Sequence, residues 1–340
     1  MALCRSGAPI VALLGPEHGF KGTAQAGLAD ADERDPVTGL IVVDTYLKDS
    51  TDLDRELSAL DLDAIIADIP DVGARFYTYA WSVVDCMRSA SRIGLPFYIL
   101  DRPNPLSGAV CEGPGVAPEC EGFLGRVNIP VRHGMTLGEL ARHAAASDQR
   151  GDMATAEPQV IRMRGWDRQM LWEDTGVSWV MPSPNLATPD TARVYPGTAL
   201  FEGTTISEGR GTTRPFEIIG APWLDEDYAD RLNACELPGV RFRPTWFTPT
   251  FSKWAGEICG GVQLHVTDRR AFEPVRTGMT MLRAAREHDS FEWITHSSRP
   301  MIDFLWGSDA LREGLDAGKD IGEIVDVSPV PETRLSEPLY

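Results

Sequence analysis

Short apolar runs alternate with amphipathic stretches over the first 145 residues of the chain. The pattern predicts strands and helices in turn: strands at 10–14, 64–69 and 97–100, helices at 81–93 and 137–146. Gly94 and Pro96 mark the end of the first helix, because both residues disfavour helical backbone there. This alternation is typical of β-α-β units, so the amino-terminal half is predicted to be α/β with a parallel sheet.

The pattern changes in the second half. A polar connector at 147–157 precedes a strand within 159–166 and a Pro-rich loop at 177–192 that contains Asn185. Further on, the pattern predicts mixed elements: a helix at 225–235, a strand-rich segment at 240–266 and helices near 272–288 and 309–317. We therefore predict two lobes, residues 1–195 and 196–340, the second smaller and α+β.

Polar side chains follow three of the predicted strands. They fall into three groups: Glu17 and His18; Asp71, Arg75 and Tyr77; Asp101, Arg102 and Asn104. Ligands commonly bind at the carboxyl ends of parallel strands, where the following loops converge, so these groups predict a site. Taken singly, each residue is better explained as a cap, a turn residue or a packed aromatic.

Residues 202–217, EGTTISEGRGTTRPFE, are rich in Gly, Thr and charge. They contain three carboxylates and two guanidiniums: Glu202, Glu208, Glu217, Arg210 and Arg214. An Arg fork binds a carboxylate through two hydrogen bonds, and a neighbouring Glu transfers protons. The alternative is a solvated loop with internal ion pairs.

Composition and charge exclude several classes of protein. The formal net charge is −18 and no Lys/Arg run is present, which argues against nucleic-acid binding. The six cysteines form no C-x-x-C pattern and no His has zinc-site spacing, so no metal or other cofactor is predicted; a Cys111–Cys120 pair is left open. No apolar run has the length of a membrane span, and the chain as given is expected to be cytoplasmic.

Six motifs resemble those of the exo-β-N-acetylmuramidase family, peptidoglycan-recycling glycoside hydrolases. They are PEHGF (16–20), DVGARFYTY (71–79), LDRPNP (100–105), PVRHGMT (130–136), PSPN (182–185) and EGTTISEGRGTTRPFE (202–217). The resemblance covers essentially the whole chain, because GVRFRPTWFTPTFSKWAGEICGGVQLHVTDR (239–269) is similar to the family's second lobe.

The resemblance implies a Rossmann-like amino-terminal lobe, a smaller carboxyl-terminal lobe and an active-site cleft between them. The implied reaction releases N-acetylmuramic acid from the non-reducing end of peptidoglycan-derived fragments such as MurNAc-GlcNAc. No nucleotide is implied, and the chain lacks the G-x-G-x-x-G fingerprint, which disfavours an NAD-dependent oxidoreductase. A binding protein for muropeptides or amino sugars, without catalysis, is the alternative.

Glycoside hydrolysis usually needs a carboxylic acid and a carboxylate. For that substrate we expect Glu17 to be the acid and Glu208 the base or stabiliser, with Asp71, Glu202 and Glu217 as substitutes. The remaining candidates would contact the sugar: Arg75, Arg210 and Arg214 its lactyl carboxylate, and His18, Tyr77 and Asn185 its hydroxyls or acetamide. If the acetamide attacks the anomeric carbon itself, one carboxylate only orients the amide.

Two departures from the family pattern are visible. Family members usually begin with a further strand and helix that carry an N-P/Q-T-G stretch, whereas this sequence begins at MALCRSGAPI. A missing segment of that kind could hold an export signal, which would make the protein secreted or periplasmic. Pro70 and Thr205 stand where the family commonly has Gln and Asn.

Overall fold

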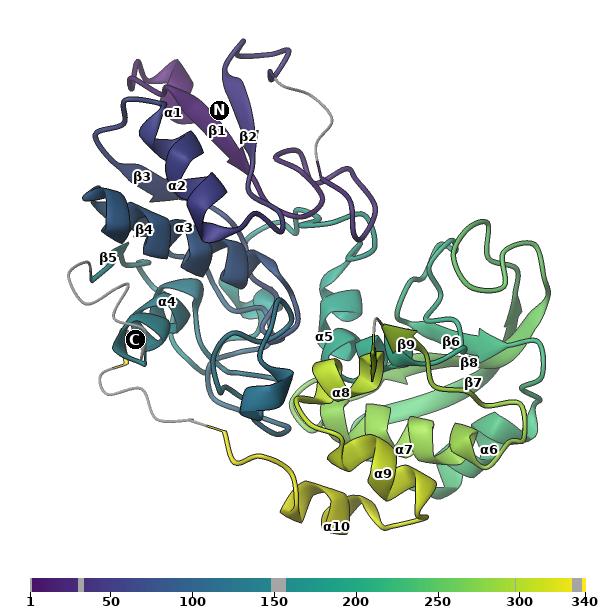
Figure 1. Cartoon of the computed structure of the whole chain (residues 1–340). Helices are drawn as coiled ribbons and strands as arrows, with labels where there is room; N and C mark the ends of the chain where they lie inside the picture. Colours follow the sequence, from purple (N-terminus) through teal and green to yellow (C-terminus); the bar gives the residue numbers. More distant parts are fainter. Residues whose placement is uncertain (1, 30–33, 148–156, 297, 332–337) are drawn as a thin grey trace.

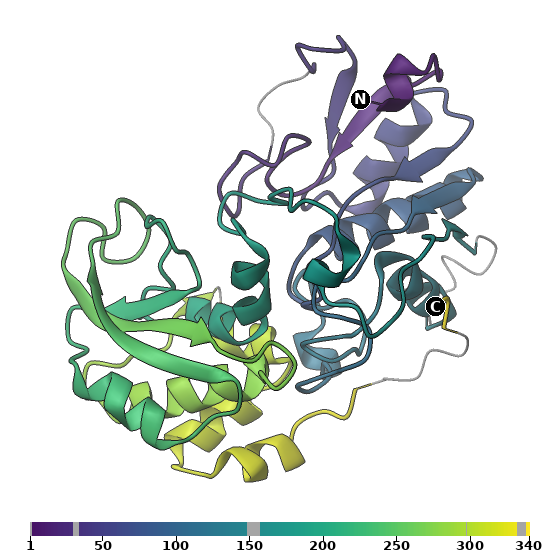
Figure 2. The same cartoon turned by 180° about the vertical axis from the view of Figure 1, so that it is seen from behind.

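The computed structural model describes residues 2–29, 34–147, 157–296, 298–331 and 338–340. The fold is mixed α/β, and parallel strands occur in its amino-terminal part. Figures 1 and 2 show strands β1 to β5 with helices α2 to α4 in one part of the molecule, and elements from α5 onward in the other. No helix of the described ranges is both long and apolar enough to cross a membrane.

The amino-terminal strands pair in parallel, as the sequence predicts. β1 (Ala12–Gly15) pairs with β2 (Ile41–Asp44), an element that the pattern did not predict. A second sheet has the order β3-β4-β5, formed by β3 (Ile65–Ala67), β4 (Phe97–Leu100) and β5 (Gln159–Ile161). All pairs within it are parallel, so the loops that follow β3 and β4 leave from the same edge.

Local sequence explains where the amino-terminal helices begin and end. Besides the short α1 (Ala2–Arg5), they are α2 (Ser50–Ser58), α3 (Tyr79–Ile93) and α4 (Leu137–Ala146). Gly94 ends α3 with a left-handed backbone, φ 76°, which glycine adopts without strain. Thr136 and Glu139 form a reciprocal capping box that starts α4.

The carboxyl-terminal part contains an antiparallel sheet of order β6-β8-β7. Its strands are β6 (Ile218–Ala221), β7 (Val240–Phe247) and β8 (Cys259–Val266). The helices are α5 (Pro189–Thr198), α6 (Asp227–Ala234), α7 (Pro274–Arg286), α8 (Met301–Trp306), α9 (Ala310–Asp316) and α10 (Ile321–Asp326). Short elements complete the fold: 3-10 turns η1 (Pro118–Cys120) and η2 (Trp172–Thr175) before α5, and 3-10 turn η3 (Ala199–Gly203) with strands β9 (Thr295–His296) and β10 (Arg299–Pro300) after it.

Two hydrophobic clusters form the core. One lies under α2 to α4 and includes the fully buried Trp81 and Leu57. The other surrounds α7 and the antiparallel sheet, and it also takes in Val72, Ala74, Phe76 and Tyr77 from the loop after β3 and Tyr79 from the start of α3. Because burying one large apolar side chain contributes about 1.5–3 kcal/mol, this second cluster binds the loop after β3 to the carboxyl-terminal part.

Helix α5 lies directly against α7 at two glycines. A Cβ added at Gly197 would overlap the carbonyl oxygen of Pro274, and one added at Gly278 would overlap the backbone of Gly197. The two helix backbones therefore touch without intervening side chains. This contact fixes the last turn of α5, which leads into η3 and residues 202–217.

The predicted elements and the observed ones differ in a few places. The Pro-rich loop was predicted to continue to residue 192, but α5 begins at Pro189, because proline is compatible with the first turn of a helix. The predicted connector at 147–157 lies mostly outside the described residues. The predicted division between residues 195 and 196 falls within α5 and stays a prediction.

Candidate active site

Glu17 lies in the loop after β1 and is 9% exposed. The Gly27 amide donates to its Oε1 at 2.7 Å, and the Thr78 hydroxyl donates to its Oε2 at 2.6 Å. His18 adopts a left-handed backbone, φ 69°, and its Nδ1 lies 2.8 Å from the Ala24 carbonyl oxygen. The loop after β1 thus folds back on itself and presents Glu17 to the residues before α3.

Asp71 follows β3 and is paired with a histidine that sequence reasoning had not singled out. Its Oδ2 accepts from the Gly73 amide at 2.7 Å and lies 3.2 Å from Nε2 of His133. The Met135 amide donates to Nδ1 of the same ring, so the imidazole lies between that amide and the Asp71 carboxylate. Both side chains are buried, and the motif PVRHGMT was the only signal for His133.

Residues 202–210 form a buried charge cluster. Arg210 Nη2 donates to Glu202 Oε1 at 2.5 Å, and its Nε lies 3.1 Å from Glu208 Oε1. Lys253 arrives from the β7–β8 connection and donates to Glu208 Oε2 at 2.8 Å. Glu208 is 2% exposed, so both of its oxygens face cations and neither faces solvent.

Lys253 had not been predicted from the sequence. It also donates to the carbonyl oxygens of Phe201 and Ile206, so its ammonium has three acceptors. It is one of only four lysines in the chain, and that rarity, together with its place in FSKWAGEICGG, was the available signal.

Glu217 and Arg214 pair with each other further along the same segment. Glu217 is buried, and its Oε1 accepts from the Thr191 hydroxyl of α5 at 2.6 Å. Arg214 Nη1 donates to Oε2 at 2.9 Å, although the Arg214 side chain is 53% exposed. Asn185, by contrast, donates to Gln25 at 3.0 Å and so lies against the loop that carries Glu17.

Aromatic contacts connect the two groups of charged residues. Ring centroids lie 4.8 to 6.2 Å apart in successive pairs along the order His18, Tyr79, Tyr77, Tyr195 and Phe216. The guanidinium of Arg210 then lies 5.0 Å from the centre of the Phe216 ring. A continuous path of contacts therefore runs from the residue after Glu17 to the partner of Glu208.

Tyr195 stands in the middle of this path. Burial raises the pKa of its phenol well above the ordinary value, and the charges of Glu202, Glu17 and Asp71 raise it further, while Arg210 lowers it. The phenol is therefore influenced by carboxylates from both parts of the chain. Sequence reasoning had placed the start of α5 in a loop and had not considered this residue.

Arg75 does not lie with these residues as a free guanidinium. It is 1% exposed, and its terminal nitrogens donate to the carbonyl oxygens of Pro114, Ile129 and Leu305. These acceptors come from three separate segments, the last in α8. The geometry assigns Arg75 a structural role that joins the two parts of the molecule, and it leaves no terminal nitrogen free for a substrate carboxylate.

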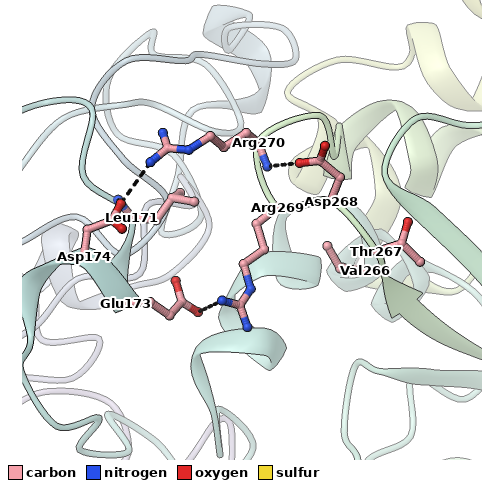
Figure 3. A pocket seen from close by; sticks show the side chains of 8 residues that line it. All are labelled: Leu171, Glu173, Asp174, Val266, Thr267, Asp268, Arg269 and Arg270. Atoms are coloured by element: carbon pink, nitrogen blue, oxygen red, sulfur yellow. Dashed lines mark hydrogen bonds and ion pairs between the residues drawn. The ribbon is translucent and has the colours of Figure 1, made fainter.

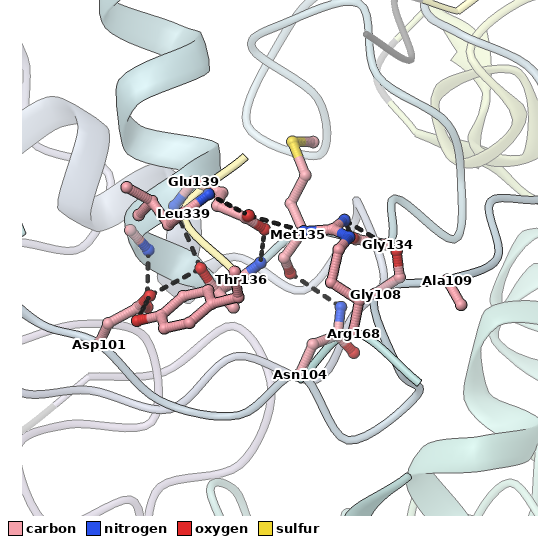
Figure 4. A network of polar contacts seen from close by, with 12 residues as sticks. Asp101, Asn104, Gly108, Ala109, Gly134, Met135, Thr136, Glu139, Arg168 and Leu339 are labelled. Atoms are coloured by element: carbon pink, nitrogen blue, oxygen red, sulfur yellow. Dashed lines mark hydrogen bonds and ion pairs between the residues drawn. The ribbon is translucent and has the colours of Figure 1, made fainter. Parts of the chain in front are cut away.

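The third predicted group, after β4, is also used structurally (Figure 4). Asp101 accepts from the Gly138 amide at 2.8 Å, from the Thr136 hydroxyl at 2.7 Å and from the Tyr340 hydroxyl at 2.8 Å. Asn104 donates to the Met135 carbonyl oxygen. Asp101 and Asn104 thus hold the start of α4 and the end of the chain. Of the three polar groups that were predicted to meet at the strand ends, the candidate site therefore includes those after β1 and β3 and not the one after β4.

A polar cavity of about 530 Å³ lies elsewhere, between η2 and the segment after β8 (Figure 3). Its charges pair internally: Arg270 lies 3.1 Å from Asp174, and Arg269 lies 3.7 Å from Glu173. None of the candidate residues lines it. We therefore define the candidate site by the charged cluster around Tyr195.

Metal binding and disulfide bonding gain no support from the described residues. Within these ranges, no group of three or more His, Cys, Asp or Glu side chains is arranged to hold a metal ion. All six cysteines are free thiols, including Cys111 and Cys120, whose pairing the sequence left open. The polar groups that the structure places in the candidate site are carboxylates, guanidiniums, an ammonium and phenols.

Comparison with known proteins identifies the family. Sequence models described as Exo-beta-N-acetylmuramidase NamZ, N-terminal, and its C-terminal counterpart match residues 1–190 and 193–329. The chain belongs to the exo-β-N-acetylmuramidase family. It is 42% identical over 320 residues to Peptidoglycan beta-N-acetylmuramidase NamZ of Bacillus subtilis (strain 168), an alignment that covers 93% of this chain and 75% of that protein.

Solved structures support the same relationship. The fold is similar to two crystal structures of DUF1343 family proteins from Bacteroides fragilis NCTC 9343. The first has a TM-score of 0.82 at 30% identity, covering 94% of this chain and 83% of the other. The second has a TM-score of 0.73 at 29% identity, with 96% and 83% covered.

Proposed function

We propose that this protein is an exo-acting glycoside hydrolase that releases N-acetylmuramic acid from the non-reducing end of peptidoglycan-derived fragments such as MurNAc-GlcNAc. The observation that carries the proposal is the path of aromatic contacts from His18, beside Glu17, through Tyr195 to Phe216. The Phe216 ring in turn lies against Arg210, which donates to Glu202. The printed name of the Bacillus relative supports the same substrate.

The finer architecture belongs to this proposal. We place a Rossmann-like lobe before α5 and a smaller α+β lobe after it, with the active site in a cleft between them. The two parallel sheets, β1-β2 and β3-β4-β5, and the antiparallel sheet β6-β8-β7 support two lobes of different class. The aromatic path from His18 to Phe216 supports a site at their junction.

Glu17 is the proposed acid. Its oxygens accept hydrogen bonds from two neutral donors, the Gly27 amide and the Thr78 hydroxyl. In this position it would protonate the departing glycosidic oxygen.

Glu202 is the better supported second carboxylate. Arg210 binds its Oε1 only, and Oε2 has no hydrogen-bond partner within the described ranges, where the side chain is 23% exposed. Glu208, the carboxylate favoured from the sequence, has both oxygens occupied by Arg210 and Lys253. We propose that Glu208 acts by holding those cations in place, and that Glu202 activates water or stabilises the oxocarbenium ion.

Arg214 is the proposed ligand of the lactyl carboxylate. Three arginines were candidates, but Arg75 is bound to carbonyl oxygens and Arg210 to two carboxylates. Arg214 donates through one nitrogen to Glu217 and is half exposed, so its fork can still reach a solvent-borne anion. His18 and Asn185 would surround the sugar hydroxyls, and Tyr77, whose own hydroxyl is sealed from solvent, would support them through its ring.

The direct experiment is to incubate the protein with para-nitrophenyl N-acetylmuramide and with a MurNAc-GlcNAc disaccharide. Free N-acetylmuramic acid should appear with both, whereas a GlcNAc-GlcNAc disaccharide, which lacks the lactyl group, should stay intact. Longer glycans should yield the monosaccharide from the first time point, as an exo-acting enzyme requires. Calorimetric binding of N-acetylmuramic acid without any release between pH 4 and 9 would instead establish the binding-protein alternative.

A further inference from the structure

The ring of Tyr195 is fixed on three sides. Phe76, Tyr77 and Phe216 contact it edge to face, with centroids 5.4, 6.1 and 4.8 Å away and interplanar angles of 73°, 86° and 87°. Each such aromatic pair contributes about 0.5–1.5 kcal/mol beyond the area it buries. The backbone below the ring is fixed as well, because α5 touches α7 at Gly197. The phenol oxygen is thus held in one place.

The hydroxyl of this rigid ring has no hydrogen-bond partner within the described part of the chain. Unlike the Tyr77 hydroxyl, the Tyr195 hydroxyl is not sealed from solvent. The buried phenols of Tyr79 and Tyr228, by contrast, donate to the carbonyl oxygens of Pro182 and Met281. A fixed but unused donor at the centre of a charged cluster is available to a ligand.

The charges around the hydroxyl decide what kind of ligand atom it takes. The raised pKa keeps the phenol protonated at neutral pH, so it serves as a donor and not as a phenolate nucleophile. Glu17, Asp71 and Glu202 all act on it, against the single cation Arg210. An anionic acceptor would be repelled by these carboxylates, so a neutral oxygen is favoured.

We propose that the Tyr195 hydroxyl donates a hydrogen bond to the acetamide carbonyl oxygen of the N-acetylated sugar and so sets the enzyme's preference for that group. The inference rests on the proposed function and extends it to a specificity residue. The lactyl carboxylate is excluded by charge, and the amide carbonyl is the strongest neutral acceptor that the sugar carries. A site built around such a bond discriminates strongly against a substrate that lacks the acceptor.

A substitution and a change of substrate together test this assignment. Tyr195→Phe keeps the ring and its three aromatic contacts and removes only the hydroxyl. We compare para-nitrophenyl N-acetylmuramide with the matching glycoside that carries a hydroxyl in place of the acetamide. Tyr195→Phe should lower kcat/KM about ten- to hundred-fold for the acetylated substrate and less than about three-fold for the other.

Tyr228→Phe is the matched control, because it removes a buried phenol oxygen at a position outside the site. It should leave kcat/KM unchanged for both substrates. If Tyr195→Phe lowers kcat/KM equally for both substrates, the assignment to the acetamide is wrong. If it lowers kcat/KM for neither, the Tyr195 hydroxyl does not contact the substrate.

A binding measurement keeps the test decisive if the wild-type protein shows no turnover. Calorimetry with N-acetylmuramic acid should then give a Kd about ten-fold weaker for Tyr195→Phe than for wild type. An unchanged Kd would reject the inference. Absence of turnover with a weakened Kd would reject the hydrolase proposal while supporting the contact. Circular dichroism and thermal unfolding would establish that the variant folds.

Discussion

Lys253 and Glu208 are 45 positions apart in the chain, yet the Lys253 ammonium donates to Glu208 Oε2 at 2.8 Å. The lysine comes from the β7–β8 connection and the glutamate from the segment after η3. Both are largely shielded from solvent, with side chains 19% and 3% exposed. This pair therefore holds a buried anion and the β7–β8 connection in a single arrangement beside the proposed site.

Replacing Lys253 by Met should destabilise the protein by about 3 kcal/mol, because it leaves Glu208 buried with only Arg210 as counter-ion. Urea unfolding measures this loss, and MurNAc release should fall with it. Lys253→Arg retains the positive charge and should recover more than half of the stability. A Lys253→Met protein as stable as wild type would mean that Arg210 alone neutralises Glu208.

Glu17→Gln should lower kcat by about 10²- to 10⁴-fold, the usual contribution of a positioned proton donor. Glutamine has nearly the same shape as glutamate, so KM and the unfolding temperature should change little. Steady-state kinetics with para-nitrophenyl N-acetylmuramide measure the effect. Thr78→Val, which removes one of the two donors to Glu17, is expected to have a smaller effect of the same sign. Full activity in Glu17→Gln would remove this residue from the mechanism.

Gly278→Ala tests the contact between α5 and α7. Alanine would by itself stabilise the helix by about 1 kcal/mol. The added Cβ would overlap the Gly197 backbone, so we expect a net loss of about 1–3 kcal/mol in the free energy of unfolding. Gly122→Ala is the control, because a Cβ there meets no atom within 4 Å. Equal stabilities of the two variants would show that the helices separate at no cost.

The ionisation of Asp54 is expected to make the free energy of unfolding depend on pH. Its hydrogen bonds from Arg92, and then from Ser89, lower the pKa of its carboxyl and join α2 to α3. The stabilisation is therefore present above the unfolded-state pKa of about 3.9 and is lost as pH falls through the lower folded-state value.

Asp54→Asn should cost about 0.5–1 kcal/mol at pH 7 and should flatten the loss of stability below pH 4. Arg92→Gln should flatten it similarly, and the double variant should show less than the sum of the two effects. Unfolding in urea at several pH values gives all three curves. An unchanged slope in both single variants would show that Asp54 carries no linked proton.

Local signals were sufficient for some elements of the fold. β4 and α4 have the predicted bounds, because the Thr136–Glu139 capping box and the flanking Gly and Pro residues act within a few positions. α5 was missed because its sequence, PDTARVYPGT, contains two prolines and lacks a strong apolar period. Besides the local Thr188 cap, the helix has a close backbone contact with α7, which is remote in sequence.

The site could be predicted only in part, since its residues depend on distant partners. The concentration of charge at 202–217 and after β1 pointed to Glu17, Glu202 and Arg210 without any knowledge of the fold. Arg75 was predicted to bind an anion from its residue type, whereas the carbonyl oxygens to which it donates lie 39, 54 and 230 positions away and could not be foreseen locally. Lys253 and Tyr195 were not predicted, because the residues that they contact are brought near them only by the fold.

The attachment of Tyr340 to Asp101 has a consequence for the motions of the molecule. The backbone passes from the first part to the second ahead of α5 (Figures 1 and 2), and Tyr340, which follows α10 in the sequence, donates to Asp101 in the first part. The two parts are therefore held together at two places. Two groups carried on one chain experience each other at an effective concentration far above that of separate molecules. A transient separation at the Tyr195 cluster would therefore be followed by rapid rejoining in the original register.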